Sequence, residues 1–117
     1  MDKRIKKWLL DIQETIKTIE SYFEGEEKDF NKYIQNGMRK KAVERNLEII
    51  GEAVNRILNF DETYAEKISD ARPIVNLRNY IIHSYDSVSD ENIWSILITH
   101  LPKLKTEVEN LLIHNNT

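Results

Sequence analysis

Residues 38–59, MRKKAVERNLEIIGEAVNRILN, decide the fold of this chain because their apolar positions recur in steps of three and four. That spacing predicts an α-helix with one apolar stripe, formed by Val43, Leu47, Ile50, Val54 and Ile57. Asn46 falls inside the stripe, and Gly51 is a place where a neighbouring backbone could approach closely. Such a helix gains most of its stability from packing, so other amphipathic helices must cover the stripe.

The flanking segments supply those helices. The N-terminal segment repeats the same alternation at Ile5, Leu9, Ile12, Ile16, Ile19 and Phe23. The sequence predicts a short helix over residues 28–35 and another that is capped by Asp61 and runs to about Ile68. A further helix begins near Pro73, which suits the first turn of a helix. A last helix is capped by Ser87, Ser89 or Asp90. Pro102 lies inside the last helix and predicts a break or kink near Thr99 to Leu101.

Length and composition fit a single domain over residues 1–117. The chain is 40% hydrophobic and 32% charged and has only three Gly and two Pro, a balance typical of a folded helical protein. We therefore expect an all-α fold, a compact antiparallel helical bundle of four main helices plus short ones. A bundle of this size with Trp8, Tyr22 and Trp94 to bury is also expected to gain surface burial as a homodimer.

Composition also excludes several kinds of site. The chain has no Cys, which rules out disulfides and thiolate zinc sites and fits a cytoplasmic location. The basic N-terminus is amphipathic, which predicts neither a signal peptide nor a membrane span. We expect no metal site and no cofactor, because His100 and His114 lack partners at ligand spacing. The net charge of −3 argues against nonspecific coating of nucleic acid, so an RNA site would need a local basic patch, at residues 3–7 or 39–41.

The segment RNYIIHSY, residues 78–85, carries the candidate chemistry. Arg78 falls on the apolar stripe of its predicted helix, which favours an ion pair with Glu48 or Glu52 on structural grounds. A guanidinium and an imidazole are also the minimal equipment for phosphoryl transfer. From spacing alone, the ion pair and a helix-capping role for His83 are the favoured interpretations.

Helical geometry separates the two groups of this segment. His83 lies five positions after Arg78, which is about 140° around the helix and about 7.5 Å along it. The two side chains converge only if the helix ends near His83 or if the segment of a second subunit faces the first. A symmetric dimer would bring two copies of Arg78 and of His83 to one cleft.

The segment resembles the Arg, four residues, His, any residue, Tyr signature of the HepT-like toxins, a branch of the HEPN superfamily of small helical proteins. The resemblance extends to residues 42–53, to Asn92-Ile93-Trp94 and to residues 101–104. It implies a homodimeric helical bundle and a metal-independent endoribonuclease, the toxin of a toxin-antitoxin pair whose antitoxin is a minimal nucleotidyltransferase. Ser84 departs from the pattern, because the family commonly has Gly there.

The resemblance also implies roles for individual residues. Arg78 and His83 map onto the catalytic positions, and Tyr85 maps onto the tyrosine that receives AMP from the antitoxin and so blocks the RNA cleft. Asn79, Glu52 and Asn46 are expected to support this site. The alternative from another class is a non-catalytic nucleotide-binding or adaptor module that pairs with a nucleotidyltransferase, which the acidity of the chain favours.

Overall fold

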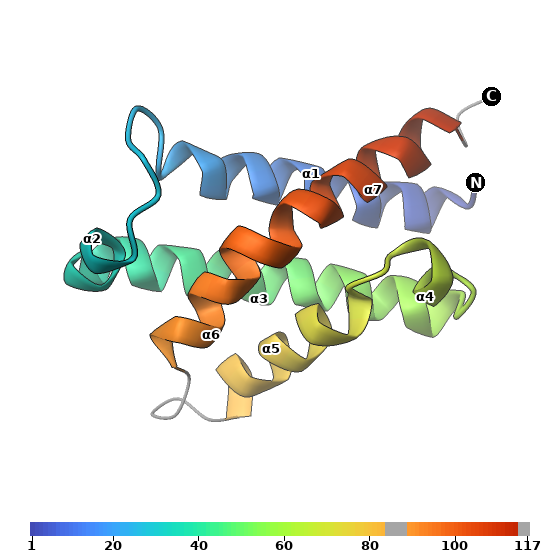
Figure 1. Cartoon of the computed structure of the whole chain (residues 1–117). Coiled ribbons are helices and arrows are strands. Elements are labelled where there is room, and N and C mark those ends of the chain that lie inside the picture. The colour runs from blue at the N-terminus through green and yellow to red at the C-terminus, as the bar shows by residue number, and fades with distance from the viewer. Residues whose placement is uncertain (84–88, 115–117) are drawn as a thin grey trace.

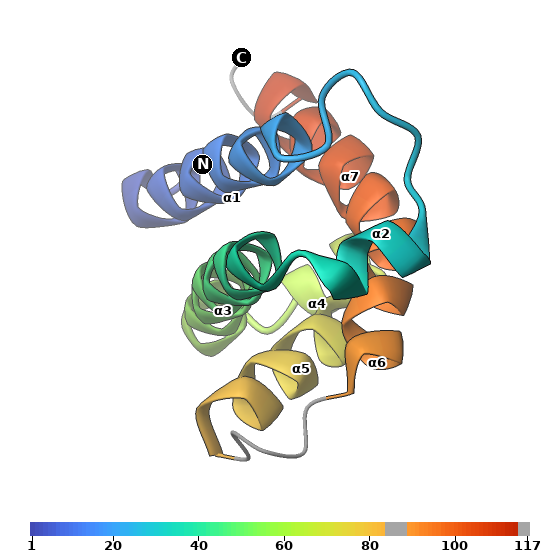
Figure 2. The ribbon, with the colours of Figure 1, turned by 90° about the vertical axis from the view of Figure 1, so that its left-hand side faces the viewer.

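The computed structural model describes residues 1–83 and 89–114, and its two layers of helices are seen in Figures 1 and 2. One layer contains α1 (Lys3–Ser21), α3 (Gly37–Phe60) and α5 (Ala71–His83), with α3 packed between the other two. Along one side of this layer run α6 (Asp90–Ser95), the π-helix η1 (Ile96–His100) and α7 (Leu101–His114). Two short helices, α2 (Phe30–Gln35) and α4 (Tyr64–Lys67), lie before and after α3. The predicted all-α bundle is confirmed.

The predicted apolar stripes form the core. Every position of the α1 and α3 stripes is at most 5% exposed, and Phe23, which follows the end of α1, is buried with them. The helix ends differ from the predicted ones by a few residues, because side-chain caps set them. Asp29 accepts hydrogen bonds from the backbone N–H groups of Asn31 and Lys32, so α2 begins at Phe30 rather than at residue 28.

The last helix has the irregularity that Pro102 predicts. Pro102 has no N–H to donate to the carbonyl four residues earlier, and the preceding turn is a π-helix in which the Leu101 N–H donates to the carbonyl of Ile96. Ser89 caps the start of this helix by accepting from the Asn92 N–H at 3.0 Å. Ser87, the other predicted serine cap, lies outside the described residues.

An aromatic cluster joins the two layers where α2 meets α6. The ring of Trp94 lies 5.2 Å from that of Tyr33, 5.8 Å from that of Phe30 and 6.2 Å from that of Phe23, measured between centroids. These are favourable spacings for tilted and edge-to-face aromatic pairs. Tyr33 is fully buried, and burial raises the pKa of its phenol, so this residue belongs to the core.

Candidate functional site

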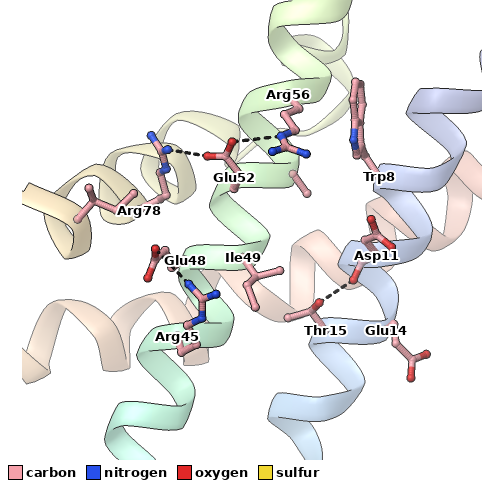
Figure 3. A pocket seen from close by; sticks show the side chains of 12 residues that line it. Trp8, Asp11, Glu14, Thr15, Arg45, Glu48, Ile49, Glu52, Arg56 and Arg78 are labelled. Atoms are coloured by element: carbon pink, nitrogen blue, oxygen red, sulfur yellow. Dashed lines mark hydrogen bonds and ion pairs between the residues drawn. The ribbon is translucent and has the colours of Figure 1, made fainter.

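A hollow on the described surface lies between α1, α3 and α5, and all of its lining comes from these three helices. Its volume is about 510 Å³. Figure 3 shows Arg45, Glu48, Glu52 and Arg56 reaching in from α3, Arg78 from α5, and Trp8 and Asp11 from α1. Three guanidinium groups and several carboxylates thus share one concave surface beside the motif helix.

Gly51 is the reason that Arg78 can lie against α3. A Cβ built on Gly51 would collide with the Arg78 Cβ and would lie 3.0 Å from its Cγ and 3.1 Å from the Ile74 carbonyl oxygen. The close approach predicted for Gly51 is therefore present, and the neighbour is the motif helix itself. The backbone of α5 and the stem of Arg78 are seated on the surface of α3.

The head of Arg78 is held by two polar neighbours. Its Nη2 lies 2.6 Å from Oε2 of Glu52, and its Nη1 donates to Oδ1 of Asn79 at 2.8 Å. Of the two predicted partners the structure selects Glu52, while Glu48 pairs with Arg45 at 3.3 Å. The Arg78 side chain is 23% exposed and lines the hollow, so its partners orient the guanidinium without covering the side chain completely.

Glu52 bridges two arginines. Its Oε1 accepts from Nε of Arg56 at 3.1 Å, one α-helical turn further along α3, while its Oε2 faces Arg78 (Figure 3). The guanidinium of Arg56 uses only its Nε in this contact, and the Arg56 side chain is 58% exposed. One carboxylate therefore fixes the relative position of a motif residue and a second cation that the sequence did not single out.

His83 is the last residue of α5, and it is exposed. It does not line the hollow, although its neighbour Ile82 does. The separation expected from helical spacing is thus present within the chain. Tyr85 lies outside the described residues, as does Ser84.

Asn46 lies away from Arg78, Glu52 and Asn79. Its Nδ2 donates to Oη of Tyr22 at 3.0 Å and to the carbonyl of Ala42 at 2.8 Å, which ties α3 to the end of α1. Asn79 and Glu52 contact Arg78, whereas the described contacts of Asn46 are with Tyr22 and Ala42. Six positions separate Asn46 from Glu52, which puts the two on different faces of α3.

The two basic segments are largely engaged by acidic neighbours. The Arg39 guanidinium bonds Oε1 of Glu26 at 2.6 Å and lies over the ring of Phe23, and Lys40 bonds Asp90 at 3.0 Å. At the N-terminus, Lys7 bonds Asp11 at 2.8 Å. The hollow beside the motif helix is lined by Arg45, Arg56 and Arg78, and by none of the residues of these two segments.

Sequence reasoning missed a contact between a histidine and an aspartate. Nδ1 of His100, in η1, lies 2.7 Å from Oδ2 of Asp70, the residue before α5, and Lys103 lies 3.4 Å from the same oxygen. The hydrogen bond with His100 is the main reason that the pKa of Asp70 lies below its usual value. Thirty positions separate the two residues, so only the fold reveals that they meet.

Metal sites and membrane-spanning helices were also sought among the described residues. Within residues 1–83 and 89–114, no three His, Cys, Asp or Glu side chains gather closely enough to hold a metal ion. Over the same residues, no helix has the length and apolar character needed to cross a bilayer.

Comparisons with known proteins agree with the resemblance. A family model described as "Ribonuclease HepT-like" matches residues 12–111. The protein named "Putative RNase MJ1380" of Methanocaldococcus jannaschii is 38% identical over 112 residues, covering 93% of this chain and 98% of the relative. "Putative RNase MJ0127" of the same organism is 31% identical over 94% of this chain and 88% of its own length.

A bacterial relative gives a similar match. "Putative RNase TTE0752" of Caldanaerobacter subterraneus subsp. tengcongensis is 32% identical over 71% of this chain and 73% of its own length. No solved structure gives a significant match to the chain.

Proposed function

Because the chain belongs to the HepT-like ribonuclease family, we propose that it is a metal-independent endoribonuclease whose site is composed of Arg78 and His83 from two copies of the chain. The relatives that cover nearly the whole chain carry the name "Putative RNase", which supports RNA as the substrate. Cleavage within the RNA strand, the pairing of two copies and the roles of the two residues are our proposal.

The observation that carries this proposal is the arrangement of α5. Arg78 is seated on Gly51 and oriented by Glu52 and Asn79, so its guanidinium is preorganised. His83 ends the same helix on another face and is exposed. A preorganised cation and an exposed imidazole that do not meet in one protomer suit a site completed by a second protomer.

In the proposed reaction, one His83 removes the proton from an RNA 2′-hydroxyl, and the 2′-oxygen attacks the adjacent phosphorus. The bond from phosphorus to the 5′-oxygen breaks, and the second His83, as imidazolium, protonates that leaving oxygen. The two Arg78 guanidinium groups stabilise the charge of the pentavalent phosphorane. The products are a 2′,3′-cyclic phosphate and a 5′-hydroxyl.

A cleavage assay with the purified protein tests this reaction. We expect full cleavage in excess EDTA by the wild type, and loss of cleavage in His83→Ala and Arg78→Ala with unchanged helical content. His114→Ala and Arg72→Ala remove the same side chains from exposed positions elsewhere and should retain activity. A strict Mg²⁺ requirement, or an active species that sediments as a monomer, would contradict the proposal.

We further propose that the chain is the toxin of a toxin-antitoxin pair and that a minimal nucleotidyltransferase neutralises it by AMP transfer to Tyr85. The family resemblance at Tyr85 supports this role. Intact-mass spectrometry after co-expression with the partner should show added AMP, and Tyr85→Phe should show none. An unchanged mass in the wild type would leave complex formation as the neutralising mechanism.

The competing function is a non-catalytic nucleotide-binding or adaptor module, and one observation favours it. Both Nη atoms of Arg78 already have partners in Glu52 and Asn79, in a chain of net charge −3. A module of this kind would cleave no RNA, and its His83→Ala variant would lose dimer stability instead. The same EDTA assay separates the two functions.

A further inference from the structure

We propose that the hollow between α1, α3 and α5 is a nucleotide subsite, in which Arg56 binds a phosphate and the indole of Trp8 stacks on a base of single-stranded RNA. This inference rests on the proposed ribonuclease function for its ligand class. It adds two residues, from α3 and α1, that the motif does not contain. It also predicts the path of the RNA strand beyond Arg78.

The unused donors of Arg56 are the first support. Its Nε is taken by Glu52, and no other described residue bonds the guanidinium, so the Nη groups are open to a ligand. A guanidinium presents five donors in a fixed fork that fits a phosphate, and here Glu52 holds one edge of that fork in place. Because Glu52 also holds Arg78, a strand bound at one arginine lies beside the other.

The position of Trp8 is the second support. Its indole is half-buried on the α1 side of the hollow, and Figure 3 shows Arg56 pointing from α3 toward it. Phe60 meets the indole in a T-shaped contact at 6.1 Å, which fixes the ring without a parallel stack. The guanidinium of Arg4, whose Nε also lies 3.6 Å from Oδ1 of Asp2, lies 4.4 Å from the centroid of the Phe60 ring and adds a cation beyond Trp8. Alternating cations and aromatic rings are the usual platform for single-stranded nucleic acid.

The size of the hollow and its charges are the third support. A volume of about 510 Å³ falls within the range of about 300–1,000 Å³ typical of small-ligand sites.

The acidic residues on the Arg78 side are paired, since Glu48 contacts Arg45 and Glu52 contacts Arg56 and Arg78. The carboxylate of Glu14 has no described partner, and Figure 3 places Glu14 at the other end of the hollow. A phosphate is therefore repelled from the Glu14 end, which directs the strand toward Arg56 and Trp8.

Tryptophan fluorescence tests the subsite directly, because the chain has only two Trp residues. The probe is a 2′-O-methylated oligoribonucleotide, which lacks the 2′-hydroxyl and is not cleaved. In Trp94→Phe, the remaining Trp8 emission should be quenched in a saturable way. Trp8→Phe should show no quenching, because Trp94 lies in the aromatic cluster away from the hollow.

Two arginine variants test the phosphate contact. Arg56→Gln should weaken probe binding about tenfold and reduce the slope of log affinity against log salt by about 0.7. With unmodified RNA the same variant should raise KM and leave kcat unchanged. Arg72→Gln removes a guanidinium from an exposed position on α5 outside the hollow and should change none of these quantities.

The outcomes separate the subsite from the ribonuclease function. If the wild type cleaves RNA, but Arg56→Gln has the same probe affinity, salt slope and KM as Arg72→Gln, the subsite is overturned and the ribonuclease function is not. Probe binding that needs Trp8 and Arg56 without any cleavage supports the subsite and overturns the ribonuclease. Absence of both binding and cleavage overturns both. If Trp8 emission changes with protein concentration and does not change with the probe, a second copy of the chain covers the hollow. That result also overturns the subsite.

Discussion

Gly51 and Arg78 touch across the interface between α3 and α5, and the missing side chain of Gly51 is what allows the contact. The packing of the bundle and the position of the candidate catalytic cation therefore depend on the same pair of residues. Substitutions at this contact should affect stability and activity together.

Gly51→Ala should lower the free energy of unfolding by about 1–3 kcal/mol, the usual cost of overpacking a close interface. It should also reduce RNA cleavage, because α5 must move away and carry Arg78 with it. Gly37→Ala is the matched control, since Gly37 is at the start of α3 with no atom within 4 Å of an added Cβ. Thermal unfolding and cleavage rates measure both effects, and equal behaviour of the two variants would contradict the prediction.

Glu52→Gln should separate kcat from KM. Replacing the carboxylate by an amide removes the ion pair that orients Arg78 and should lower kcat roughly tenfold, while KM should change little because the Nη groups of Arg56 stay open to the phosphate. Glu48→Gln removes a carboxylate one helical turn away that pairs with Arg45 instead. Steady-state kinetics should show the kcat decrease in Glu52→Gln only.

Asn46 should prove structural. Asn46→Ala and Tyr22→Phe each remove the hydrogen bond between Nδ2 of Asn46 and Oη of Tyr22, and each should cost about 1 kcal/mol of stability. A double-mutant cycle should show coupling between them, with cleavage by the folded variants unchanged. Tyr80→Phe, at a residue that is 57% exposed, is the control for loss of a hydroxyl. Lost activity at full stability would restore Asn46 to the site.

Asp70 should make stability depend on pH. Its pKa is lower in the folded chain than in the unfolded one, so its contribution is present above the unfolded value of about 3.9 and is lost as pH falls through the lower folded value. Asp70→Asn should therefore be less stable than the wild type near pH 7, with the gap closing below about pH 4. Glu27→Gln, at an exposed carboxylate without a described partner, should show no such gap in denaturant titrations.

The core was predictable because it depends on periodicity within each helix. Ile5 through Ile19 and Val43 through Ile57 recur at helical spacing, and the structure buries them. The π-helix was predictable only as an irregularity, since the absence of an N–H at Pro102 does not specify which bonds replace the missing one.

The site was less predictable because it depends on how helices register against each other. From the sequence, Glu48 and Glu52 were equal candidates for the ion pair with Arg78. The packing of α5 against Gly51 places Arg78 beside Glu52. Trp8 lies 48 positions before Arg56, and Asp70 lies 30 before His100, so no local pattern brings either pair together. Tyr85 stays a prediction from resemblance alone.

The helix that carries Arg78 and His83 packs mainly on α3 and only marginally on η1, and Figure 2 shows it at the edge of its layer. An edge helix can detach by sub-global unfolding, at a lower free energy than that needed to open the whole bundle. Amide hydrogens of α5 should accordingly exchange with solvent faster than those of the central part of α3. The motif helix would then be the cooperative unit whose opening a bound partner or ligand suppresses.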